Sequence, residues 1–141
     1  MNLLVSLMLF GLCFSSNVRS PQHCLSYEPS TVTLKGKVIR KTFAGPPNYE
    51  SVRKGDAPET CWILHLIKPI CVNADKTMTG GDKPEKNVYE IQIRLSEKQY
   101  TQYESLLGKR VEVSGKLMHA FTAHHHTNIL LTLEEMKGVR E

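Results

Sequence analysis

The chain has 141 residues, which is enough for one domain with a single hydrophobic core. Its formal net charge is +4, and its Lys and Arg residues are scattered and interrupted by Asp and Glu. Because nucleic-acid-binding proteins normally gather such residues into a basic stripe, this distribution argues against nucleic acid as a partner.

The first 20 residues have the pattern of a secretory signal peptide. An apolar run over residues 3–14 is too short to span a bilayer comfortably, and small polar residues follow it. We therefore predict a signal peptide over residues 1–20 and a mature domain over residues 21–141, exported to the periplasm or secreted. A retained membrane anchor is the alternative, but after signal removal no stable membrane span is expected.

Cys13 lies in the predicted signal peptide and would be removed with it. Export would place the other three cysteines in an oxidising compartment, where disulfides form. Cys24, Cys61 and Cys71 allow one bridge and leave one free thiol. A bridge between Cys24 and Cys71 would fix the N-terminal segment to the sheet, and a bridge between Cys61 and Cys71 is the main alternative. As a free thiol, Cys61 is predicted to behave as a small buried hydrophobic residue.

Residues 32–43, 61–72 and 88–95 have the alternation of β-strands. Successive strand side chains point to opposite faces, so each strand has a predicted core-facing set. These sets are Val32, Leu34 and Val38; Trp62, Leu64 and Leu66; and Tyr89, Ile91, Ile93 and Leu95. Ile63 and Ile67 are apolar on the opposite side of the second strand, which suggests that both its faces are covered.

A polar connection with two glycines and a proline, over residues 73–87, separates the second and third strands. A helix is predicted after the third strand, because Ser96 and Gln99 fit a capping box. Gly108 is placed to end this helix.

Residues 107–133 predict a β-hairpin with three consecutive histidines just after its turn. One side of the hairpin is apolar, with Val111, Val113, Leu117, Phe121, Ile129, Leu131 and Leu133. Gly115 interrupts this side and Gly36 interrupts the first strand. Glycines inside strands mark bends, as at the corners of a small barrel.

The predicted order is three strands, a helix and two strands. It predicts a mainly β protein, a five-stranded OB-fold-like barrel with the helix between strands 3 and 4. An open α+β sheet with the helix on one face is the alternative.

In such a barrel, ligands lie across a face flanked by the loop after strand one and the loop after strand four. Here these are the proline-rich loop 44–60 and the histidine turn 121–126. Because loops often carry function, we predict that the two loops converge into one ligand-binding surface. Its candidate residues are Tyr49, Glu50, His124, His125 and His126.

The histidines also suggest a metal site. His124 and His126 are two residues apart, so on a strand they project to the same side, and His119 on the other hairpin strand could approach them. Imidazoles in this arrangement could bind zinc, copper or nickel. A firm site needs three or four ligands and the spacing assures two, so the favoured expectation is no cofactor, with zinc as the alternative.

These features favour an exported, non-enzymatic binding or interaction module, because no stretch carries an evident catalytic motif. Its partner would be an envelope protein, a glycan or a small ligand. The alternative is a small metal-dependent enzyme or a metal-binding protein that uses the histidine cluster.

Several motifs of the mature chain together resemble one family. They include Cys-Leu-Ser-Tyr-Glu-Pro at 24–29, Gly-Pro-Pro-Asn-Tyr-Glu-Ser at 45–51, Pro-Ile-Cys-Val at 69–72 and His-His-His-Thr at 124–127. The family consists of small exported bacterial domains, family 4431 of the domains of unknown function. The resemblance implies an exported location and a Cys24–Cys71 disulfide, and it implies no known activity.

Overall fold

The computed structural model describes residues 23–75 and 82–140. The predicted signal peptide, residues 1–20, and part of the polar connection at 73–87 lie outside these described residues. The strands are β1 (Thr31–Ala44), β2 (Pro58–Val72), β3 (Glu85–Arg94), β4 (Arg110–His119) and β5 (Ile129–Gly138). The helical segments are η1 (Val52–Lys54), α1 (Glu97–Tyr103) and η2 (Glu104–Leu106).

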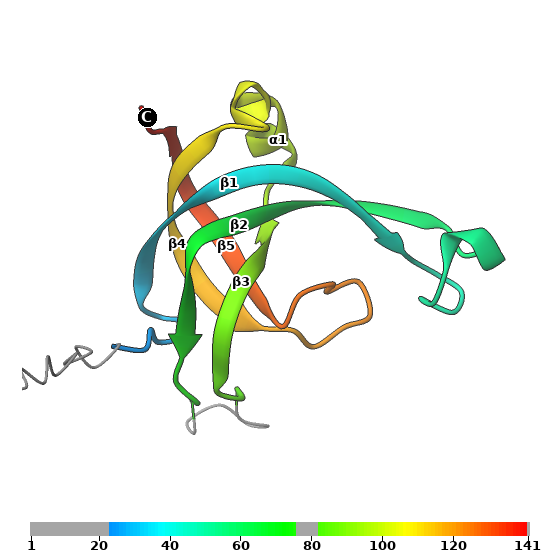
Figure 1. Cartoon of the computed structure of the whole chain (residues 1–141), viewed down its shortest axis with the longest axis horizontal. Coiled ribbons are helices and arrows are strands. Elements are labelled where there is room, and N and C mark those ends of the chain that lie inside the picture. Colours follow the sequence, from blue (N-terminus) through cyan, green and yellow to red (C-terminus); the bar gives the residue numbers. More distant parts are fainter. Residues whose placement is uncertain (1–22, 76–81, 141) are drawn as a thin grey trace, which may run out of the picture.

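The five strands close into a barrel in the order β1-β2-β3-β5-β4, because β1 pairs with both β2 and β4 (Figure 1). β3 and β5 run parallel, whereas the other neighbouring strands are antiparallel. The helix α1 follows β3 and precedes β4. The prediction of a mainly β, OB-like barrel is therefore confirmed, and the open-sheet alternative is wrong.

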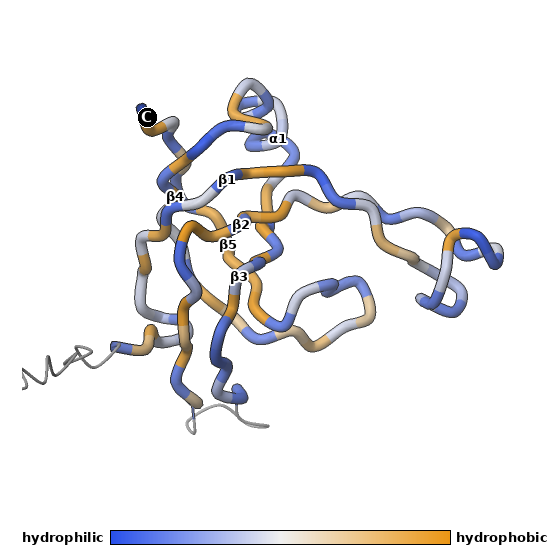
Figure 2. Tube along the Cα trace, viewed as in Figure 1, coloured by the Kyte–Doolittle hydropathy of each residue, from blue (hydrophilic) through white to orange (hydrophobic). Residues whose placement is uncertain are grey.

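The core fills the barrel interior, and the hydropathy of the trace shows apolar residues recurring along the barrel strands (Figure 2). Most predicted core residues are buried, with Val38, Leu64 and Ile91 fully enclosed. Burying side chains of this kind contributes roughly 1.5–3 kcal/mol each relative to exposure, an upper bound for an extended reference chain. Alternation along β1, β2 and β4 is thus enough to identify most of the interior.

Three apolar residues that were predicted to be covered are exposed: Ile67, Tyr89 and Phe121. The register of β2 and β3 shifts beyond the pair His65–Glu90, and past this shift Val88 packs against the core, so Tyr89 points outward. Phe121 follows the end of β4, where strand alternation no longer applies, and it is 71% exposed. Those predictions for Tyr89, Ile67 and Phe121 are wrong.

The N-terminal segment is fixed to the barrel by a disulfide between Cys24 and Cys71. Next to it, Leu25 forms a parallel bridge with Val72, and the buried Tyr27 hydroxyl donates to the Lys83 carbonyl at 2.6 Å. The Cys24–Cys71 pairing is confirmed and the Cys61–Cys71 alternative is wrong.

Cys61 is a free thiol, as predicted, but it is only partly buried and so less enclosed than the predicted small buried hydrophobic residue. Burial raises the pKa of this thiol, with a smaller contribution from the Glu59 carboxylate. A raised pKa keeps Cys61 in its protonated, weakly nucleophilic form.

The helix begins with the predicted capping box. The Gln99 amide donates to the Ser96 hydroxyl at 3.4 Å, and the Ser96 amide donates to the Gln99 side chain at 2.9 Å. Gly108 has a φ of 77°, as expected of a residue that ends a helical segment. In the part of the chain that the structure describes, no helix is long and apolar enough to cross a membrane.

Candidate functional site

β1 and β2 extend past the barrel as a two-stranded arm, which reaches to the right in Figure 1. We define the arm as residues 41–61. Its strands remain paired as far as Ala44 and Pro58, so the predicted loop 44–60 is shortened at its two ends to the segment 45–57. The paired ends of β1 and β2 hold the proline-containing turn away from the barrel.

The buried carboxylate of Asp56 organises the turn of the arm. One oxygen accepts from the amide and the side chain of Asn48, at 3.0 and 3.1 Å. The other accepts from the amides of Glu50 and Ser51, both at 2.8 Å. These hydrogen bonds, led by those from Ser51 and Glu50, lower the pKa of Asp56 and hold the turn in one conformation.

The loop between β4 and β5, residues 120–128, is called here the histidine loop, and Gln92 of β3 anchors it. The Gln92 side chain accepts from the His126 amide at 2.7 Å and donates to the His124 carbonyl at 3.2 Å. Its own amide donates to the Thr127 hydroxyl at 2.9 Å. One glutamine therefore fixes the path of the loop across the outer face of β3.

Two apolar side chains that flank Gln92 on that outer face explain why the loop stays there. Ile63, Gln92 and Leu130 are opposite one another in register across β2, β3 and β5. Ile63 and Leu130 are fully buried although they lie outside the main core cluster. We infer that the histidine loop, anchored on Gln92, lies over this row and excludes water from it.

Glu59 of β2 joins the arm to the histidine loop. Its two carboxylate oxygens accept from His124 Nδ1 at 2.6 Å and from His126 Nε2 at 2.8 Å. Burial alone would raise the pKa of Glu59, but the hydrogen bonds and charges of His126 and His124 outweigh it and lower the pKa. The His126 ring also stacks in parallel on Phe43, with ring centroids 4.4 Å apart.

Tyr49, at the tip of the arm, reaches the same loop. Its hydroxyl lies 3.2 Å from His124 Nε2, and the two rings meet edge to face at 5.5 Å. Because His124 Nδ1 donates to Glu59, a neutral His124 has Nε2 free to accept from the tyrosine. The structure thus brings together Tyr49, His124 and His126, while the side chain of Glu50 stays exposed and only its amide is used.

His125 closes the histidine loop on itself instead of facing the arm. Its Nδ1 accepts from the amides of Phe121 and Thr122, at 3.1 and 3.3 Å. Its ring also meets Phe121 edge to face at 4.7 Å. Two backbone donors at Nδ1 require that this nitrogen carries no proton.

We expect mild acid to loosen the histidine loop at His125. Burial, followed by the charges of Arg94, His124 and His126, lowers the pKa of His125 from its usual 6.5. The unfolded loop therefore binds a proton more readily, so this contribution to stability is complete above about pH 6.5 and falls as the pH drops through the lowered value. Hydrogen-exchange protection factors for the Phe121 and Thr122 amides should decrease between pH 7.5 and pH 5.

A matched variant separates this effect from general acid sensitivity. His125→Gln offers a neutral acceptor, so its loop protection should no longer depend on pH in this range. Protection that falls equally in the wild type and in His125→Gln would contradict the assignment.

His119 is not part of the arm junction. Its ring nitrogens lie 2.9 Å from a Glu85 oxygen and 3.0 Å from the Ala120 carbonyl, and its ring packs edge to face near Tyr27. The predicted ligand set of His119, His124 and His126 is therefore not assembled. Within residues 23–75 and 82–140, no group of three or more His, Cys, Asp or Glu side chains is arranged to hold a metal ion.

Reasoning from sequence missed Glu59, Gln92 and Asp56. Glu59 lies within the predicted loop 44–60, but nothing in its spacing relates it to histidines more than 60 residues later. The one available signal for Asp56 was its place in a proline- and glycine-rich turn, where Asp commonly binds backbone amides.

Comparison with known proteins gives one family match. Residues 90–137 match the sequence model of a family described as a domain of unknown function, DUF4431. No curated protein matches the chain in sequence. The matched residues run from the middle of β3 almost to the end of β5 and include Gln92 and the whole histidine loop. Over these residues, about a third of the chain, the protein is similar to the DUF4431 family.

Proposed function

We propose that the protein is an exported, non-enzymatic binding module whose ligand contacts the surface shared by the arm and the histidine loop. Export is supported by the signal-like pattern of residues 1–20 and by the Cys24–Cys71 disulfide, since such bridges persist in oxidising compartments. Binding is supported by the position of the surface, because OB-like barrels use the loops after their first and fourth strands.

The contact between His124 and the arm carries this proposal. This contact places two segments that are distant in sequence next to each other, so that they share one surface. On that surface the side chain of His124 is 62% exposed and that of His126 only 8%. Phe121, on the same loop, is 71% exposed. The exposed Phe121 ring, packed edge to face on the His125 imidazole, offers a stacking face that suits a sugar ring, such as that of an envelope glycan.

An NMR titration of the isotope-labelled protein with soluble peptidoglycan fragments tests this function. Shift changes should concentrate in residues 44–60 and 121–126, and Phe121→Ser should weaken binding at least tenfold. Tyr89→Ser is the matched control, because Tyr89 is also a half-exposed aromatic residue but lies outside both loops. Fragments that leave these residues unshifted, or that bind Phe121→Ser as well as the wild type, would contradict the proposal.

A metal-binding function is the second candidate, and Glu59 is the observation that favours it. Glu59 is a further donor beside the two imidazoles, but the three side chains are hydrogen-bonded to one another and are not arranged to hold a metal ion, so zinc would have to replace the hydrogen bonds at 2.6 and 2.8 Å and rearrange all three. Calorimetric titration with zinc should then show one site per chain that is lost in Glu59→Gln and kept in Glu85→Gln. Absence of a stoichiometric complex would remove this candidate.

A further inference from the structure

Arg94 lies on the outer face of β3, at the border of the histidine loop. It is two residues from Gln92, the anchor of that loop, and both side chains point outward because Ile91 and Ile93 fill the core. Residues two apart on a strand are separated by roughly 7 Å. After burial, the charge of Arg94 is the next cause that lowers the pKa of His125, as expected of a cation beside this loop.

Two side chains of the neighbouring strands hold the Arg94 guanidinium in place. Its Nη1 donates to the sulfur of Met118 at 2.9 Å and to the hydroxyl of Thr132 at 3.4 Å. A thioether is only a weak acceptor, so these contacts position the guanidinium without neutralising it. Arg94 is exposed, and within residues 23–75 and 82–140 it makes no ion pair and its Nη2 and Nε donate to no residue.

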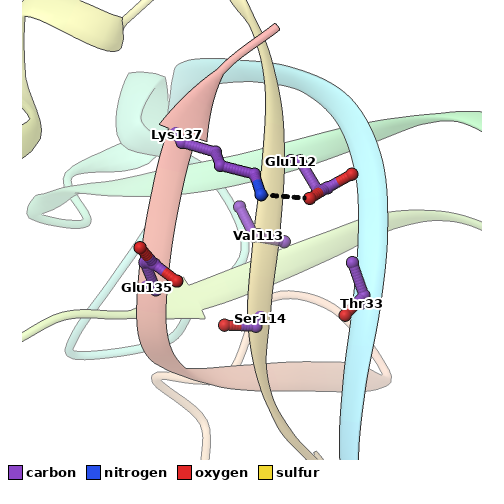
Figure 3. Close-up of a pocket in the computed structure, with 6 residues that line it drawn as sticks. All are labelled: Thr33, Glu112, Val113, Ser114, Glu135 and Lys137. Atoms are coloured by element: carbon purple, nitrogen blue, oxygen red, sulfur yellow. Dashed lines mark ion pairs between the residues drawn. The ribbon is translucent and has the colours of Figure 1, made fainter.

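Other cations on the outer side of the barrel show the ordinary arrangement. Lys35 and Lys137 share the carboxylate of Glu112, at 3.3 and 2.8 Å. Figure 3 shows the pair of Glu112 and Lys137, which joins neighbouring positions of β4 and β5. The protein thus compensates these two lysines with its own carboxylate, whereas the guanidinium of Arg94 keeps free donors.

Two contacts relate the exposed ring of Phe121 to this guanidinium. Phe121 follows Met118, which holds Arg94, by three residues, where the end of β4 leads into the histidine loop. The Phe121 ring also packs edge to face on His125, with ring centroids 4.7 Å apart. A stacking face and a cation with free N–H donors therefore border the same part of the histidine loop.

We propose that Arg94 binds the carboxylate of an acidic sugar whose ring stacks on Phe121. This inference rests on the proposed glycan-binding function and specifies its ligand, a glycan whose sugars carry carboxylates. Paired N–H groups of Arg match the two oxygens of a carboxylate, and such pairs are stronger than most surface ion pairs. Glu50 and Glu59, the carboxylates of the shared surface, belong to the arm, so the acidic group of the ligand would point away from the arm.

Two disaccharides that differ in one acidic group test this inference. The first joins N-acetylglucosamine to N-acetylmuramic acid and carries a lactyl carboxylate, whereas chitobiose has the same sugar backbone without it. Both are titrated into the labelled protein at pH 7.5 and low ionic strength, and the Phe121 and His125 amides are followed by NMR. The wild type should bind the acidic disaccharide about fivefold more tightly, because charge-assisted hydrogen bonds add to stacking.

Variants of Arg94 separate recognition of the carboxylate from stacking. Arg94→Gln should bind the two disaccharides equally and keep the wild-type affinity for chitobiose, which shows that the histidine loop is intact. Arg94→Lys keeps the charge but not the paired donors, so it should lose most of the preference. Arg40→Gln is the matched control and should keep the preference, because Arg40 is exposed on β1 outside both loops and pairs with Glu104 at 3.5 Å.

The outcomes distinguish this inference from the proposed function. Equal binding of the two disaccharides by the wild type, or a preference that persists in Arg94→Gln, would overturn the role of Arg94 and leave the glycan surface in place. A preference lost equally in Arg40→Gln would reveal an effect of net charge and would also overturn it. No shift with either disaccharide would overturn the inference, and no shift with longer peptidoglycan fragments would overturn the proposed function as well.

Discussion

Replacing Gly115 with alanine is expected to destabilise the protein by about 3 kcal/mol, at the upper end of the overpacking range. A Cβ at this position would run into the carbonyl oxygen of Thr132 on β5, and would also lie 3.1 Å from Leu131. The obstacle is backbone, so no side-chain rotation relieves it. The register of β4 and β5 shifts at this glycine, and the close approach is what lets β4 bend.

Gly138→Ala in β5 is the matched control, because a Cβ there meets only Leu106, at 3.4 Å. Urea unfolding of the two variants under the same conditions measures the difference. Similar midpoints for Gly115→Ala and the wild type would show that β4 and β5 can separate without cost.

Loss of the disulfide is expected to cost about 4 kcal/mol in the chain-entropy model, which is the larger of the two effects. The Cys24–Cys71 bridge closes a loop with a sequence separation of 47 residues, so it removes many conformations from the unfolded chain. Cys24→Ser/Cys71→Ser should therefore unfold at a much lower urea concentration than the oxidised wild type.

Two controls accompany this measurement. Cys61→Ser changes the free thiol and should leave the urea midpoint near that of the wild type. A reducing agent should lower the wild-type midpoint to that of the double variant and leave the double variant unchanged. Equal midpoints for the wild type with and without the reducing agent would contradict a stabilising role for the bridge.

Much of the fold was predictable because it depends on local pattern. Alternation identified the strands, and the capping box from Ser96 to Gln99 identified the helix. Gly36 and Gly115 identified the bends, since each is pressed against the backbone of a neighbouring strand. These features are encoded within a few residues of one another.

The chemistry of the candidate site was less predictable, because its contacts join distant residues. The convergence of residues 44–60 and 121–126 followed from the barrel order, but the identity of the joining groups did not. Glu59 and Gln92 are ordinary polar residues on the outer sides of strands until the histidine loop returns over them. In the same way, Arg94 and Met118 are separate in sequence and become neighbours only through strand pairing.

Because the five strands close into a barrel, the segment that matches the family model cannot form the whole fold by itself. Residues 90–137 include part of β3 and nearly all of β4 and β5, but β1 and β2 lie outside them. Cut out as a fragment, these residues would leave β3 and β4 with unsatisfied edges and the faces of Leu117 and Leu131 open to water. The folded barrel is therefore wider than the segment that matches the family model, and it includes the N-terminal segment held by Cys24.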